Sequence, residues 1–269
     1  HLGWVSLDPD VHTTPAASAW TQAVQTRAVL ASVSADTRCG CLYSDLGTLE
    51  VWETAGAAPE LSQPIEDLER LVAAREGCVI RSWVKATRHR LDGTAVELSA
   101  DGRALTADAG GLLVATPTQV LSFSSEGERV DTVDVGPAVS AVARSGDWLL
   151  LGYEDGNIER VTPSHGTARP GLNLEDTVSS EVLVLAAGPL GTVVAGHANG
   201  RVGLWSLDDG LLLEEASLLG PVTHLAVLGD SLVAATGLGD HLRWELDTLV
   251  MDRCELLRDV WDDVPVVWE

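Results

Sequence analysis

The fold is decided by the stretch Val193-Val-Ala-Gly-His-Ala-Asn-Gly-Arg-Val-Gly-Leu-Trp205, in which two largely apolar runs flank a short polar turn. Alternation on both sides of a turn that contains Gly is typical of a β-hairpin. The same phrase recurs as Cys41-Leu-Tyr-Ser-Asp-Leu-Gly-Thr-Leu-Glu-Val-Trp52 and as Leu149-Leu-Leu-Gly-Tyr-Glu-Asp-Gly-Asn-Ile-Glu-Arg-Val161. The sequence therefore predicts an all-β protein assembled from repeated hairpins.

The hairpins recur at a nearly constant period. Aligned on the last strong position of the second strand, they are 38, 33, 38, 44 and 39 residues apart. These spacings centre on the roughly 40–45 residues of a four-stranded propeller blade and exceed leucine-rich periods. Apolar residues alternate instead of recurring at helical spacing, which argues against helical repeats. The alignment positions are Trp52, Arg90, Phe123, Val161, Trp205 and Trp244.

Three of the hairpins end in a characteristic apolar or basic residue followed by Trp. Through these pairs the chain resembles WD40-type β-propellers over roughly residues 28–247. The family carries Trp-Asp at this place, whereas Ser206, Glu53 and Glu245 follow the Trp here. The resemblance therefore implies the fold and none of the family's hydrogen-bonding residues. The pairs are Leu204-Trp205, Val51-Trp52 and Arg243-Trp244.

Closure of such a ring commonly uses a strand from one terminus. His1-Leu-Gly-Trp-Val-Ser-Leu7 closely resembles Arg201-Val-Gly-Leu-Trp-Ser-Leu207, so we expect it to be a propeller strand. Six four-stranded blades closed by this strand is the first choice. Seven blades is the alternative, with residues 1–25 forming the outer half of a blade that begins upstream. The expected division is a closing strand and linker at 1–27, the propeller at 28–250, and a tail at 251–269.

The tail carries a helical pattern. Cys254, Leu257, Val260 and Trp261 fall on one face at helical spacing, which predicts a short C-terminal helix. It is similar to the helical tail that closes some bacterial WD40 arrays in multidomain signalling proteins.

The charge balance limits the partners. The chain has 17 Lys and Arg against 40 Asp and Glu, a net charge of −23. Such a field repels nucleic acid and anionic membranes. No apolar run reaches the roughly 20 residues of a membrane span, and no signal peptide with a basic start is present.

The four cysteines are too few and too scattered for a secreted disulfide framework. We therefore expect a cytoplasmic protein with reduced thiols. The chain starts at His1 and its single Met is Met251, which indicates a processed product or a piece of a larger parent.

Candidate chemistry is sparse. Cys39 and Cys41 are two residues apart and share one face of a predicted strand. They are either half of a zinc site or two small buried residues, and no second Cys or His pair stands at ligand spacing. His197 and His224 lie in strand or turn contexts typical of packed or hydrogen-bonded imidazoles. No nucleophile elbow or phosphate loop is present. We expect no catalytic residue, metal or cofactor.

One basic cluster interrupts this acidic chain. Arg81, Lys85, Arg88, His89 and Arg90 crowd into ten residues around Trp83. They are either the outward residues of a degenerate hairpin or a docking patch for an acidic partner. In the second reading Trp83 is the aromatic anchor, and Arg81 and Arg88 are the ionic contacts.

The sequence thus favours a non-catalytic, monomeric propeller that serves as an interaction scaffold. Its partners would be proteins or other domains of a larger bacterial signalling protein that it regulates. One alternative is a regulatory inhibitor or protease substrate released by processing. Another is a propeller hydrolase or lyase, which needs His and acidic groups converging at the central channel.

Overall fold

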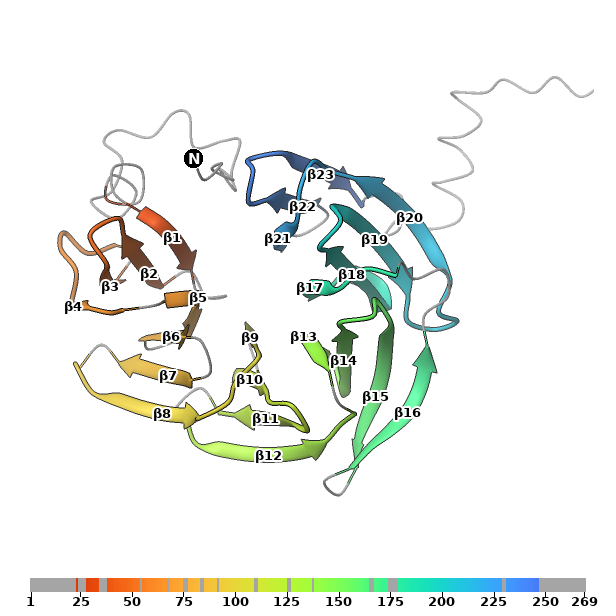
Figure 1. The fold of residues 1–269 in the computed structure, drawn as a ribbon, viewed down its shortest axis with the longest axis horizontal. Helices are drawn as coiled ribbons and strands as arrows, with labels where there is room; N and C mark the ends of the chain where they lie inside the picture. The colour runs from red at the N-terminus through yellow and green to blue at the C-terminus, as the bar shows by residue number, and fades with distance from the viewer. Residues whose placement is uncertain are drawn as a thin grey trace, which may run out of the picture.

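A computed structural model describes Ala23 and residues 28–33, 38–53, 55–66, 68–74, 77–82, 85–90, 92–108, 111–124, 127–136, 138–164, 167–173, 179–228 and 231–246. Within these residues, successive antiparallel strands form six groups that follow one another along the chain. We number these groups blades 1 to 6. Figure 1 shows them arranged around a ring, each with its first strand nearest the centre.

The first three blades have four strands each. They are β1 (Ala28–Val33), β2 (Cys39–Ser44), β3 (Thr48–Glu53) and β4 (Leu61–Pro64); β5 (Leu68–Ala74), β6 (Gly77–Ser82), β7 (Lys85–Arg90) and β8 (Ala95–Ser99); β9 (Ala104–Asp108), β10 (Gly111–Ala115), β11 (Gln119–Phe123) and β12 (Arg129–Asp134).

Blades 4 and 5 also have four strands, and the described part of blade 6 has three. They are β13 (Val139–Ser145), β14 (Trp148–Tyr153), β15 (Ile158–Ser164) and β16 (Thr167–Asn173); β17 (Val182–Ala187), β18 (Thr192–His197), β19 (Arg201–Ser206) and β20 (Leu212–Ser217), with the 3-10 turn η2 (Pro189–Gly191) before β18; β21 (Val222–Leu228), β22 (Ser231–Thr236) and β23 (His241–Glu245).

The repeated hairpins are confirmed as the second and third strands of each blade. The hairpin of the basic cluster and the hairpin that ends at Phe123 also pair as predicted, β6 with β7 and β10 with β11. The weakly patterned outer strands β12 and β20 are mostly exposed, as expected for the edge of a blade. A single parallel bridge, Asp134 to Thr167, joins the outer strands of blades 3 and 4.

The described strands leave the ring open between blade 6 and blade 1 (Figure 1). The expected closing strand at 1–7 and the helical tail at 251–269 lie outside the described residues. Six blades against seven therefore stays a prediction.

The core lies mainly between blades, because five of the six buried clusters among the described residues combine the facing sides of two neighbours. Trp205 of blade 5, for example, packs with Leu150 and Ile158 of blade 4. Two glycines allow this approach. A Cβ on Gly152 would lie 2.8 Å from Val182 Cβ of the next blade, and one on Gly196 would lie 2.8 Å from Val222 Cβ.

Blades 1 and 2 are also joined covalently. Cys41 on β2 and Cys78 on β6 form a disulfide with their Cα atoms 5.9 Å apart, and both side chains are fully buried. The expectation of reduced thiols is wrong for these two residues. Their spacing of 37 residues is about one repeat, so equivalent strands of neighbouring blades bring them together. Cys39 is buried in the same cluster.

Five of the six described innermost strands share an irregularity at their start, and β9 lacks it. In β1, β5, β13, β17 and β21 one extra residue interrupts the pairing with the second strand. Such a β-bulge takes one residue out of the ladder and redirects side chains next to it. In four of these strands the extra residues are Glu69, Ser140, Leu183 and Thr223.

Candidate functional site

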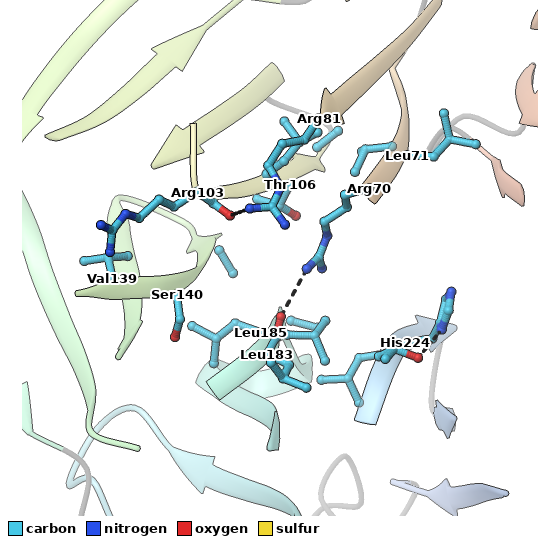
Figure 2. A pocket seen from close by; sticks show the side chains of 18 of the residues that line it. Arg70, Leu71, Arg81, Arg103, Thr106, Val139, Ser140, Leu183, Leu185 and His224 are labelled. Atoms are coloured by element: carbon cyan, nitrogen blue, oxygen red, sulfur yellow. Dashed lines mark hydrogen bonds between the residues drawn. The ribbon is translucent and has the colours of Figure 1, made fainter. Parts of the chain in front are cut away.

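A cavity of about 1010 Å³ lies at the centre of the ring, among the innermost strands of blades 2 to 6. All four bulge residues line it, so the irregular start of each strand shapes its rim. Further along the strands its wall is apolar, formed by Leu71, Val72, Leu185 and Leu225 among others. Figure 2 shows the cavity with the side chains that face it.

Four arginines line this cavity although the chain carries a net charge of −23. Blade 2 supplies two of them, the residue just before β9 is the third, and the innermost strand β13 supplies the fourth. Three glutamates also face the cavity: Glu69, Glu154 and Glu181. The arginines are Arg70, Arg81, Arg103 and Arg144.

Arg70 reaches across the cavity from β5 to β17. Its Nη1 donates a hydrogen bond of 3.2 Å to the backbone carbonyl of Leu183, the bulge residue of blade 5 (Figure 2). Burial, together with the nearby positive charge of Arg81, lowers the pKa of Arg70 to about 10. Among the residues that the structure describes, no carboxylate forms an ion pair with Arg70. Its contact across the cavity is therefore to a neutral acceptor.

Arg81 lies directly opposite Arg70 in the β5–β6 ladder. Its Nη2 is 3.1 Å from Glu69 Oε2, and its Nη1 donates a 2.5 Å hydrogen bond to the carbonyl of Arg103. Its buried Nε has no hydrogen-bond partner among the described residues. Arg81 is thus only partly compensated.

The other two arginines have polar partners. Arg103 Nη1 lies 3.1 Å from Glu154 Oε1, and Arg144 Nη2 donates a 3.1 Å hydrogen bond to the Ser122 hydroxyl. Blade 2 therefore holds the cavity's least compensated positive charge.

A histidine also faces the cavity, opposite Arg70 (Figure 2). His224 Nδ1 lies 2.8 Å from the Thr223 hydroxyl. Desolvation, and then the charge of Arg70, lowers the pKa of His224. Its charged neighbour is a cation, and no described carboxylate hydrogen-bonds to it. His224 and three glutamates therefore line the same cavity, but among the described residues none of these glutamates is hydrogen-bonded to the imidazole.

The expected packed state of His197 is confirmed. Its side chain is fully buried, its Nδ1 is 2.9 Å from the Ser180 carbonyl, and its ring lies 6.3 Å from that of Trp205. Burial lowers the pKa of His197.

The basic cluster predicted from sequence is divided by the strand geometry. Arg81 faces the central cavity, whereas Lys85 is half exposed at the start of β7 and pairs with Glu97 at 2.8 Å. Arg90 lies at the far end of the same strand, and Trp83 lies outside the described residues.

The remaining two members are buried. Arg88 is only 2% exposed, and its guanidinium lies against Gly127. His89 is also buried, with Nδ1 against the side-chain amide of Gln63 in blade 1. The expected role of Arg88 as an ionic contact for a partner conflicts with this burial. Both residues are buried by segments far from them in the chain, at Gly127 and at Gln63, which a run of basic residues in the sequence does not reveal.

Sequence reasoning did not single out Arg70, Arg103 or Arg144. It sought basic residues close together in the chain, while the ring gathers residues from separate repeats. The usable signal is positional: Arg70 and Arg103 lie at or just before the start of an innermost strand.

No group of His, Cys, Asp or Glu in the described part of the chain is arranged to hold a metal ion. Among the same residues, no helix has the length and apolar character needed to cross a bilayer.

No known protein family and no curated protein matches the sequence. Solved structures match its fold. The C-terminal WD40 domain of Sif2 has a TM-score of 0.62 and 14% identity, over 83% of this chain and 68% of that chain. Hsv2 from Kluyvelomyces marxianus has a TM-score of 0.55 and 13% identity, over 82% and 76%. The computationally designed protein Ika8 has a TM-score of 0.60 and 17% identity, over 82% and 72%.

These likenesses confirm the expected class. The chain has a WD40-like β-propeller fold. At these identities the comparison shows the fold alone.

Proposed function

We propose that this protein is a non-catalytic interaction platform that binds protein partners, or other domains of a longer parent, on the loops of its propeller. The observation that carries the proposal is the WD40-like ring itself. Successive blades pack against one another and leave variable loops on two faces, which suits a rigid docking scaffold. Because a fold alone does not fix a function, binding has to be measured.

We further propose that the platform is monomeric and is the regulatory part of a larger bacterial signalling protein. Its net charge of −23 supports protein partners over nucleic acid or anionic membranes. The expected cytoplasmic location rested on reduced thiols. The Cys41–Cys78 disulfide removes that support, since disulfides persist mainly in oxidising compartments.

The partner contact is assigned to the face of the ring where β6 ends and β7 begins. Lys85 stands there with 49% of its side chain exposed, and Arg81 lies nearby in the ladder, since Ser82 pairs with Lys85. An acidic partner would displace the exposed Lys85–Glu97 pair at little cost, because such surface pairs contribute only about 0–1 kcal/mol. Arg88 and His89, further along β7, are buried and are not part of this contact.

The test is capture of partners by the longest natural form of the protein, compared with Lys85→Glu. The matched control is Arg129→Glu, an exposed arginine on the outer strand β12 whose Nε bonds to Thr132. We expect Lys85→Glu to lose proteins that the wild type and the control both retain, measured by quantitative mass spectrometry. Equal recovery from Lys85→Glu and wild type would reject this face. Equal loss from both variants would point to overall charge instead.

A further inference from the structure

The residue pair that follows the bulge in the first two strands of a blade differs in size and charge between blades. After each bulge, the innermost strand and the second strand present a directly paired couple of residues. In blades 4, 5 and 6 the second member is small. The couples are Ala141–Gly152, Val184–Gly196 and His224–Ala235, whereas blade 2 has Arg70–Arg81.

The small residue has a packing role. Gly152 and Gly196 leave room for Val182 and Val222 at the start of the next blade. Blade 2 has no small residue at this position. Its Arg81 donates a hydrogen bond to the carbonyl of Arg103, just before the innermost strand β9 of blade 3. A large cation therefore occupies a place that blades 4, 5 and 6 fill with Gly or Ala, while blade 1 has the neutral Tyr43 there.

Two like charges directly opposite each other in a ladder destabilise a sheet. Glu69 lies 3.1 Å from Arg81 but does not pair with Arg70, whose acceptor is the neutral Leu183 carbonyl. Among the arginines and glutamates of the lining, four positive charges against three negative ones leave one excess positive charge. A ligand with a single negative charge near Arg70 would therefore neutralise this excess positive charge.

We propose that the central cavity binds a small organic anion whose one carboxylate or phosphate group is held by Arg70 and Arg81. Guanidinium groups bind both oxyanions through paired N–H donors, and such charge-assisted bonds are about twice as strong as neutral ones. The body of the ligand lies against Leu71, Val72, Leu185 and Leu225. The volume, about 1010 Å³, is at the upper end of small-molecule sites. This role goes beyond the proposed partner docking at Lys85, although Arg81 lies close to both places.

The test titrates the 269-residue chain with benzoate and with phenyl phosphate at low salt, using benzyl alcohol as the neutral probe. Calorimetry reports binding, and the stronger anion identifies carboxylate or phosphate as the group preferred. The decisive variant is Arg70→Val with Arg81→Gly, which copies the Val184–Gly196 couple of blade 5. We expect it to remain folded and to bind the anion at least tenfold more weakly.

The matched control is Arg201→Met, which removes a guanidinium on β19 that pairs with Glu215 and does not line the cavity. We expect its anion affinity to equal that of the wild type. If the double variant does not fold, Arg70→Met alone is measured, and the same tenfold loss is expected. The proposal is overturned if neither anion binds, if benzyl alcohol binds as tightly as the anions, or if a folded Arg70 variant retains wild-type affinity.

Discussion

Replacing Gly196 by Ala tests the packing between blades most directly. The added Cβ would lie 2.8 Å from Val222 Cβ, 2.9 Å from Val184 Cγ1 and closer still to Val222 Cγ1. Val222 is fully buried and starts an innermost strand, so it has little room to move. Overpacking of this kind costs about 1–3 kcal/mol, while the loss of glycine's freedom in the unfolded chain returns about 0.4–1 kcal/mol. We expect a net loss of about 1–2 kcal/mol.

Urea unfolding measures this loss through the transition midpoint at constant slope. The matched control is Gly136→Ala, because a Cβ there meets nothing within 4 Å. That variant should be unchanged or slightly more stable. Adding Val222→Ala to Gly196→Ala removes the contact with Val222 Cγ1 and should relieve part of the clash, with a coupling energy of about 1 kcal/mol or more in a double-mutant cycle. If Gly196→Ala matches the control in stability, or if the cycle is additive, the described fit between blades 5 and 6 is wrong.

Two further perturbations test the molecule as a whole. Reducing the Cys41–Cys78 disulfide should lower the free energy of unfolding by about 2–4 kcal/mol, because the bond closes a loop of 37 residues in the unfolded chain. Urea transitions with and without reductant measure the loss, and a thiol assay shows that reduction is complete. Equal stability after complete reduction would contradict the prediction. Lowering the pH from 7.5 to 5.5 should also destabilise the fold, because burial lowers the pKa values of His89 and His197. The unfolded chain then binds more protons below about pH 6.5, so the stability present above that pH is lost as the pH falls toward the folded pKa values. His197→Gln should flatten the profile, and an unchanged slope would count against this assignment.

The sequence was most informative where local chemistry decides the structure. Gly200 and the Asp-Gly pair before Asn157 mark hairpin turns, and alternation around them predicts the paired strands. The β6–β7 hairpin was found without such a turn, because the repeat period fixed its place. The WD40-like fold followed from these repeats.

The cavity was not predictable in the same way. A bulge such as that at Glu69 adds one residue to a strand and leaves almost no trace in an alternating pattern. The disulfide joins two residues one repeat apart, so no cysteine spacing within a single blade reveals it. The exposure of Lys85 and the burial of Arg88 depend on packing against the neighbouring strands, which composition does not encode.

The bulges also allow the side chains that face the cavity to vary without a change in the strand pairing that builds the scaffold. An acid, an alcohol, an aliphatic side chain and a second alcohol occupy the same structural place at Glu69, Ser140, Leu183 and Thr223. Each stands outside the ladder, so none is constrained by strand pairing. Evolution or a designer can therefore rewrite the chemistry of the channel one repeat at a time, while the scaffold around it stays the same.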